Sequence, residues 1–281
     1  HSFWNVSVMK KFGAICIAIL IASGVCAQAY TPRNVRMDTL PDMPLRSHPQ
    51  NSFKVGEKLT YRIHYGIIDA GEAQLEVKNS PYTFDNRPAY HIVGTGKSLG
   101  AFNWVFKVRD RYETYVDKAG LFPYRFIRDV NEGGYEIYQD YTFHQVKRAV
   151  RTHEKKEFEM PDFTQDMISA FYYARTLDFS KAKPGDVFTI MTFVDNEVFP
   201  LKIKFKGKED VELRSGTYKC LRFVPVIQEG RIFKEEEDMH VWITDDNNHI
   251  PILVKSKILI GSIKMEMTEY SGLAHPIAKV N

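Results

Sequence analysis

A repeated spacing of turn and strand landmarks constrains the fold of this 281-residue chain more than any other sequence feature. Four pairs of landmarks lie 127 to 129 residues apart: Gly56 with Gly185, Tyr115 with Trp242, Pro123 with Pro251, and Gly133 with Gly261. Self-similarity at a fixed offset is typical of an internally repeated fold, although glycine, proline and alternating apolar residues also recur in unrelated β-segments. We therefore expect a structural duplication.

Around these landmarks, apolar and polar residues alternate. Leu59, Tyr61 and Ile63 are separated by single polar residues, which is the period of two expected of a half-buried strand. The glycines of residues 66–71 predict a turn, so residues 57–78 should form a β-hairpin. Similar short turns follow along the chain and leave no room for crossover helices. The predicted fold class is mainly β, with two related antiparallel modules, each a curved sheet or partial barrel.

One segment, residues 163–178, departs from this pattern. Met167, Phe171 and Ala174 recur at helical spacing, and Asp162 followed by Gln165 resembles a capping box. The sequence predicts a single α-helix between the two modules. Its apolar face could close both cores by packing, or it could cover a ligand cavity as a lid, and the two roles use the same residues.

The amino terminus predicts export. Met9-Lys10-Lys11 supplies a positive region, residues 12–25 an apolar stretch, and Ala27-Gln28-Ala29 a cleavage site, as in a secretory signal peptide. We expect no transmembrane segment after cleavage. Cys26 leaves open acylation as a lipoprotein, although Val25 stands where a small residue is usual.

These patterns divide the chain into six expected segments. They are upstream residues and signal peptide (1–29), a Pro-rich leader (30–52), the first β-module (53–160), a helical connector (161–183), the second β-module (184–272) and a C-terminal tail (273–281).

The chain carries no sequence signature of catalysis, metal binding or nucleic-acid binding. Its 38 basic and 35 acidic residues are interspersed, so there is no basic stripe for nucleic acid. Nucleophile-elbow, phosphate-loop and zinc-protease motifs are absent, and the histidines are scattered rather than closely spaced. Cys220, in a strand-like run, is expected to be a buried apolar residue. We predict neither a cofactor nor a catalytic residue.

A binding protein is therefore the first functional hypothesis. Aromatic residues make up 13% of the chain, and an exported protein with one amphipathic helix could hold a lipid-like ligand between helix and sheet. The predicted ligand-binding residues are Met167, Phe171 and Tyr172 of the helix, with Tyr61 and Tyr65 of the first strand. The alternatives are a scaffold for an envelope protein or glycan, and, less favoured, a glycan or cell-wall hydrolase. The sequence does not indicate an oligomeric state.

Several strings together carry a resemblance to a known family. Phe53-x-Val55-Gly56-Glu57-x-Leu59-x-Tyr61, the strand Asp110-x-Tyr112-Glu113-x-Tyr115-x-Asp117 and the helical segment Asp166–Arg175 resemble the bacterial domain-of-unknown-function family 3108 over residues 53–271. The resemblance implies a β-rich protein of the Gram-negative periplasm or outer-membrane periphery. It brings no activity and no functional residues with it.

Overall fold

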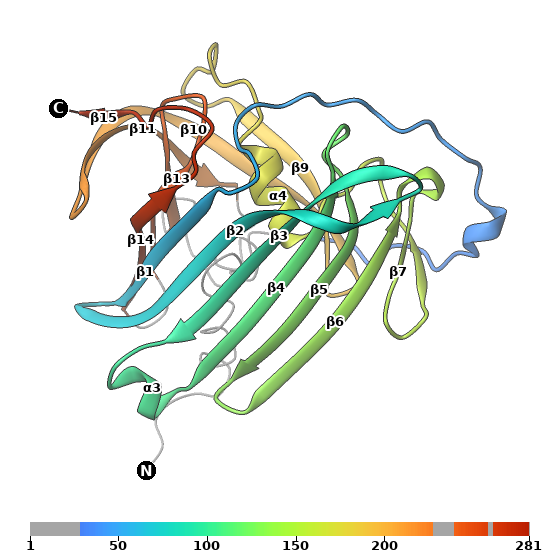
Figure 1. Cartoon of the computed structure of the whole chain (residues 1–281), viewed down its shortest axis with the longest axis horizontal. Helices are drawn as coiled ribbons and strands as arrows, with labels where there is room; N and C mark the ends of the chain where they lie inside the picture. Colours follow the sequence, from blue (N-terminus) through green and yellow to red (C-terminus); the bar gives the residue numbers. More distant parts are fainter. Residues whose placement is uncertain (1–28, 227–238, 258–260, 281) are drawn as a thin grey trace.

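The strands form one curved antiparallel sheet. The computed structural model of the chain describes residues 29–226, 239–257 and 261–280. Within these ranges, fourteen strands follow one another in hydrogen-bonded order, from β8 down to β1 and then from β14 down to β9, and β15 pairs with β11 (Figure 1). The first and last strands of this order, β8 and β9, do not pair with each other, so the sheet is unclosed. The mainly β, antiparallel fold class predicted from the sequence is confirmed.

The first half is a meander of six strands extended by two short ones. These strands are β1 (Lys58–Tyr65), β2 (Ile68–Phe84), β3 (Arg87–Ser98), β4 (Val108–Asp117), β5 (Pro123–Glu132), β6 (Tyr135–His144), β7 (Ala149–Arg151) and β8 (Glu157–Glu159). Inward positions alternate along each strand, as the period of two requires. A one-turn helix, α3 (Phe102–Val105), connects β3 to β4 and was not predicted, because four residues are too few to show helical periodicity.

The second half repeats this meander. Its strands are β9 (Val187–Val194), β10 (Glu197–Leu213), β11 (Gly216–Pro225), β12 (Met239–Thr244), β13 (Pro251–Lys257) and β14 (Ser262–Ser271), followed by β15 (Lys279–Val280). β9 and β10 contain 8 and 17 residues, as β1 and β2 do, and each begins 129 residues after its counterpart. The offset found in the sequence thus also relates strand positions. β10 runs through Gly207 with a register shift between Phe205 and Gly207.

The two halves meet in one ladder. β1 pairs with β14 along its whole length, so the modules share a single sheet instead of forming two. Side chains reinforce the junction: the His64 ring lies between Asp69, 2.7 Å from Nδ1, and Glu266, 2.8 Å from Nε2. The Tyr61 hydroxyl donates to the Pro251 carbonyl at 2.9 Å. One continuous hydrophobic core therefore draws on both halves and on the intervening helix.

The helix α4 (Met167–Ala174) lies on the concave side of the sheet (Figure 1). It is shorter than the predicted 163–178, and its capping box consists of Asp166 and Ser169 instead of Asp162 and Gln165. The reason lies in the preceding backbone. Phe163 has a positive φ of 54°, and Gln165 forms a bridge with Thr192 of β9, so the chain is still extended before Asp166.

The leader after residue 29 is a strap across the open side of the sheet. Tyr30 bridges Val198 of β10, and Asn34 bridges Phe158 of β8, so the strap links the next-to-last strand at one end of the order to the terminal strand at the other. It then continues through a 3₁₀ turn, η2 (Met37–Thr39), and a second such turn, η3 (Gln145–Lys147), follows β6. The Arg46 guanidinium fixes the later part of the strap by donating to the Gly120 and Leu121 carbonyls at 2.7 Å each.

The predicted signal peptide, including Cys26, lies outside the described residues apart from Ala29. Among the residues that the structure does describe, no helix has the length and apolar character needed to cross a bilayer.

Candidate functional site

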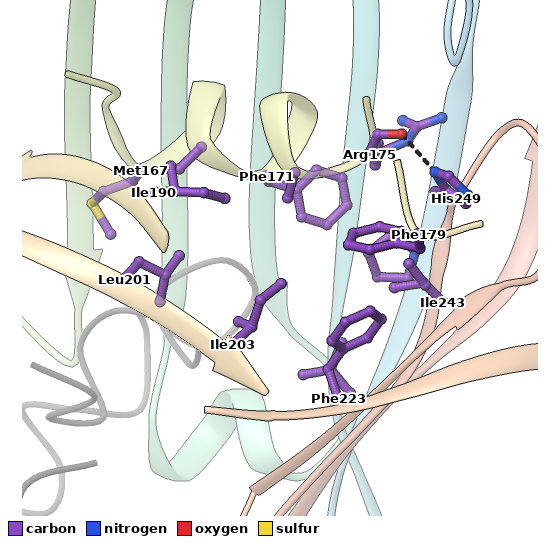
Figure 2. Close-up of a pocket in the computed structure, with 14 residues that line it drawn as sticks. Met167, Phe171, Arg175, Phe179, Ile190, Leu201, Ile203, Phe223, Ile243 and His249 are labelled. Atoms are coloured by element: carbon purple, nitrogen blue, oxygen red, sulfur yellow. Dashed lines mark hydrogen bonds between the residues drawn. The ribbon is translucent and has the colours of Figure 1, made fainter. Parts of the chain in front are cut away.

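An apolar cavity of about 60 Å³ lies between α4 and the second half of the sheet. Figure 2 shows Met167 and Phe171 projecting from the helix toward Leu201, Ile203 and Phe223. The remaining lining residues are Ala170, Ala174, Arg175, Phe179, Ile190, Val241, Ile243, His249 and Pro251. A void needs only about 10–15 Å³ to admit a water, but a cavity with apolar walls stays dry and accepts apolar molecules. This space therefore suits a short hydrocarbon segment.

The capping box fixes the N-terminal end of α4, the helix that covers the cavity. Asp166 Oδ1 accepts hydrogen bonds from the Ile168 and Ser169 amides at 2.8 Å each, and Ser169 Oγ accepts one from the Asp166 amide at 2.9 Å. Thr114 of β4 donates to Asp166 Oδ2 at 2.5 Å, which ties the helix to the first half. Burial raises the pKa of Asp166 to about 6, against the effect of these hydrogen bonds.

A buried ion pair fixes the other end of the helix. Arg175 follows α4, and its guanidinium makes a bidentate contact with Glu57. It also donates to the Asn248 carbonyl at 2.9 Å and to the Ser52 carbonyl at 3.2 Å. Because Glu57 neutralises the guanidinium and the Asn248 and Ser52 carbonyls accept two further hydrogen bonds from it, Arg175 has no free charge to offer a ligand.

His249 is the other polar residue in the cavity wall. Its Nδ1 lies 2.8 Å from the Arg175 carbonyl oxygen, the contact drawn as a dashed line in Figure 2. A carbonyl can only accept, so Nδ1 carries the proton, and in the neutral ring Nε2 is then an acceptor. Its ring also packs edge-on against Phe179, with centroids 5.1 Å apart. His249 can thus accept one hydrogen bond at the edge of an otherwise apolar space.

Phe171 separates this cavity from a second, smaller one in the first half. The second space, about 10 Å³, is bounded by Phe171, Tyr61, Tyr112 and Met265, among others, and by the carboxyl-bearing residue Asp110. One aromatic ring therefore belongs to both walls. Movement or removal of that ring would connect the two spaces.

The inward face of β4 and β5 in the first half carries buried charged residues. Asp110, Arg128 and Glu132 are buried at inward positions of β4 and β5. Burial, and then the charge of Glu132, raises the pKa of Asp110 to about 8. A glycosidase needs two carboxyl groups flanking a cleft that admits a sugar, and the 10 Å³ space beside Asp110 does not admit a sugar ring. In the described residues, no group of three His, Cys, Asp or Glu side chains could hold a metal ion.

The five predicted ligand-binding residues fall into different places. Met167 and Phe171 line the main cavity, and Tyr61 joins Phe171 at the smaller one. Tyr172 lines neither space: it packs edge-on against Phe53, with ring centroids 4.9 Å apart, and beside Arg175. Tyr65 lines neither space and lies near Gly261 at the end of β1.

The cavity-lining residues of the second half were not predicted from the sequence. The alternation along β10 carried a signal for Leu201 and Ile203, since both occupy the same face. No local signal pointed to Arg175 or His249, because their contact joins residues 74 positions apart.

Comparison with known proteins places the chain in a family. The model of a family described as protein of unknown function (DUF3108) matches residues 60–268, about three quarters of the sequence. The chain belongs to DUF3108. The match confirms the resemblance noted in the sequence analysis. The family description assigns no activity to the cavity. No curated protein matches the chain.

Solved structures similar to this DUF3108 member share little sequence with it. A β-barrel-like protein of the unknown-function family DUF1849 from Brucella abortus is 10% identical, with a TM-score of 0.49, over 78% of this chain and 98% of that one. A putative lipoprotein from Parabacteroides distasonis is 10% identical, with a TM-score of 0.34, over 82% and 100%. The hypothetical protein CT021 from Chlamydia trachomatis is 9% identical, with a TM-score of 0.35, over 80% and 92%.

Proposed function

We propose that this DUF3108 protein is an exported, non-catalytic binding protein of the cell envelope that holds the apolar part of a lipid-like molecule beneath α4. The cavity carries the proposal, because its wall is apolar apart from Arg175 and His249. The signal-peptide pattern at residues 9–29 supports export.

The cavity wall has no free positive charge, which disfavours anionic ligands. Burying a carboxylate or phosphate without a counter-charge is costly, and Arg175, the cation in this wall, is already neutralised by Glu57. His249 can accept a hydrogen bond from a hydroxyl group. The part of the ligand that enters is therefore an uncharged hydrocarbon, with at most a hydroxyl at the His249 end.

Native mass spectrometry tests occupancy directly. Protein purified gently from its own cells should carry a hydrophobic adduct, and its first residue should report cleavage after residue 29. A protein that is always empty and takes up no alkanol on titration would overturn the proposal and leave the scaffold hypothesis.

Titration with defined probes tests the site. Dodecanol should bind saturably and more tightly than dodecanoate at pH 8, because the carboxylate finds no counter-charge in the wall. Ala174→Leu, which fills the cavity, should abolish dodecanol binding. Ala182→Leu is the matched control, since Ala182 packs against the core outside the cavity and its replacement should leave binding intact. Equal loss in both variants would contradict the assignment of the site.

A further inference from the structure

Large apolar side chains are exposed at the end of the sheet where α3 lies. Trp104 is 92% exposed, and Val105, Ile67 and Ile68 are also exposed. Ile67 lies in the β1–β2 turn and Ile68 begins β2, whereas Trp104 and Val105 belong to α3. Tyr135, just after the β5–β6 turn, is exposed at the same end (Figure 1). We call these five residues the α3 rim.

The α3 rim is held rigidly. The Leu99 amide donates to the Ala70 carbonyl at 3.0 Å, which joins the α3 connection to β2. The Gly133 amide donates to the Lys107 carbonyl at 2.7 Å, which joins it to the β5–β6 turn. On the inner side of α3, Phe106 is buried and its ring occupies the space where a Cβ at Gly133 would lie. Trp104 and Val105 are thus presented outward by a fixed scaffold, although water is a poor solvent for them.

Basic side chains lie close to the α3 rim. Residues 97–109 contain Lys97, Lys107 and Arg109, all exposed, and no acidic residue. The neighbouring acids on β2 are paired within the protein: Asp69 with His64, and Glu72 with both Arg62 and Lys97. On β6, Glu136 accepts a hydrogen bond from the neutral Asn131 amide and keeps its charge, which the two charges of Lys107 and Arg109 together exceed. Lys107 and Arg109 therefore leave an excess of positive charge beside Trp104.

We propose that the α3 rim docks this protein on the surface of an anionic lipid bilayer. Trp and Tyr favour the membrane interface, where an apolar ring meets water, and each Lys or Arg close to an anionic surface adds attraction. A bilayer surface is the same in every direction within its plane. Exposed loop tips can therefore insert into it without the complementary groove that a protein partner would need. The proposal does not depend on what the cavity under α4 holds.

Vesicle flotation tests docking. The protein, purified from its own cells with its first residue determined, should float with vesicles of phosphatidylcholine containing about 30% phosphatidylglycerol, and less with phosphatidylcholine alone. The double substitution Trp104→Ser with Val105→Ser should lower the partition coefficient about tenfold. The double substitution Lys107→Gln with Arg109→Gln should remove most of the dependence on phosphatidylglycerol.

Controls come from the opposite end of the sheet. Tyr82 and Val187 are also exposed, but they lie at the far end of β2 and at the start of β9. Tyr82→Ser and Val187→Ser should leave flotation unchanged, as should Ala174→Leu in the cavity. Unchanged flotation of the Trp104/Val105 variant, or an equal loss in the Tyr82 variant, would overturn the proposal. Failure of the unmodified protein to bind anionic vesicles would also overturn it, and would favour a protein partner for the rim.

Discussion

Arg175 donates to Glu57 through two parallel hydrogen bonds, Nη1 to Oε1 at 2.6 Å and Nη2 to Oε2 at 2.8 Å, and the two side chains are 1% and 0% exposed. Glu57 immediately precedes β1, whereas Arg175 follows α4. Through its hydrogen bond to the Asn248 carbonyl, Arg175 also reaches the second half. One guanidinium thus connects the start of the sheet, the helix and the wall of the cavity.

Breaking this pair should strongly destabilise the fold. Glu57→Gln leaves a buried guanidinium without its counter-charge, so we expect the free energy of unfolding to fall by about 3 kcal/mol or more. Chemical denaturation measures the change. Asp38→Asn is the control, because the Arg36–Asp38 pair is exposed to solvent and its loss should not be measurable. An unaltered midpoint for Glu57→Gln would contradict the role assigned to the pair.

Asp110 should make the free energy of unfolding depend on pH. Its folded-state pKa, about 8, lies above its unfolded value of 3.8, so the native state binds the extra proton. The stability it contributes is full below about pH 4 and is lost as the pH rises through 8. Asp110→Asn should therefore gain stability relative to the unmodified protein between pH 5 and pH 8, by about 4 kcal/mol. Urea unfolding at the two pH values provides the measurement.

Asp117 supplies a control of opposite sign. Burial acts to raise its pKa, but hydrogen bonds from Arg87 and Tyr124 outweigh burial and lower it. Its contribution is present above its unfolded pKa and is lost as the pH falls. Asp117→Asn should accordingly cost stability at pH 7 and matter less in acid. If both aspartate variants changed in the same direction with pH, the assignment for Asp110 would be wrong.

Removing the ring of Phe171 should merge the two cavities. Phe171→Ala should lower the free energy of unfolding by about 3 kcal/mol. Added dodecanol should restore part of this loss, because a ligand that binds only the native state raises its stability. Thermal unfolding with and without dodecanol measures the rescue. Phe143→Ala removes a buried ring away from both cavities, so it should be destabilised without being rescued.

Gly272 should tolerate no side chain. It has a positive φ of 67°, and a Cβ there would meet the Gly56 carbonyl oxygen. Gly134 also has a positive φ, 88°, but nothing lies within 4 Å of the corresponding position. Gly134→Ala should cost about 1 kcal/mol from the left-handed backbone alone, and Gly272→Ala at least twice as much. Similar unfolding midpoints for the two variants would refute the argument.

Patterns with a short range in the sequence predicted most of the fold. Alternation gave strands such as β1 and β5, because each inward position depends only on its neighbours. Helical spacing found α4, but its start was misplaced by the chemistry of Asp162, which resembles a cap without acting as one. The fusion of the halves through β1 and β14 was missed, since no local signal tells which edges pair.

The candidate site depended on contacts that the sequence does not record locally. Met167 and Phe171 were predictable because they share one face of a helix. Arg175 looked like an ordinary polar residue after the helix, and its burial follows from the meeting of Glu57 and Asn248 from distant segments. Asp110 was likewise unremarkable, because its raised pKa arises from burial and from Glu132 on the adjacent strand.

Because the meander is repeated, a position in one half can be compared with the matching position in the other half. Leu121 and His249 lie 128 residues apart, before β5 and β13, and both have a left-handed backbone, with φ of 47° and 44°. Yet the first is a buried apolar residue and the second the hydrogen-bonding edge of the cavity. These two positions share a backbone conformation but not a role, so exchanging residues between the halves at such a pair separates what the scaffold requires from what the ligand requires.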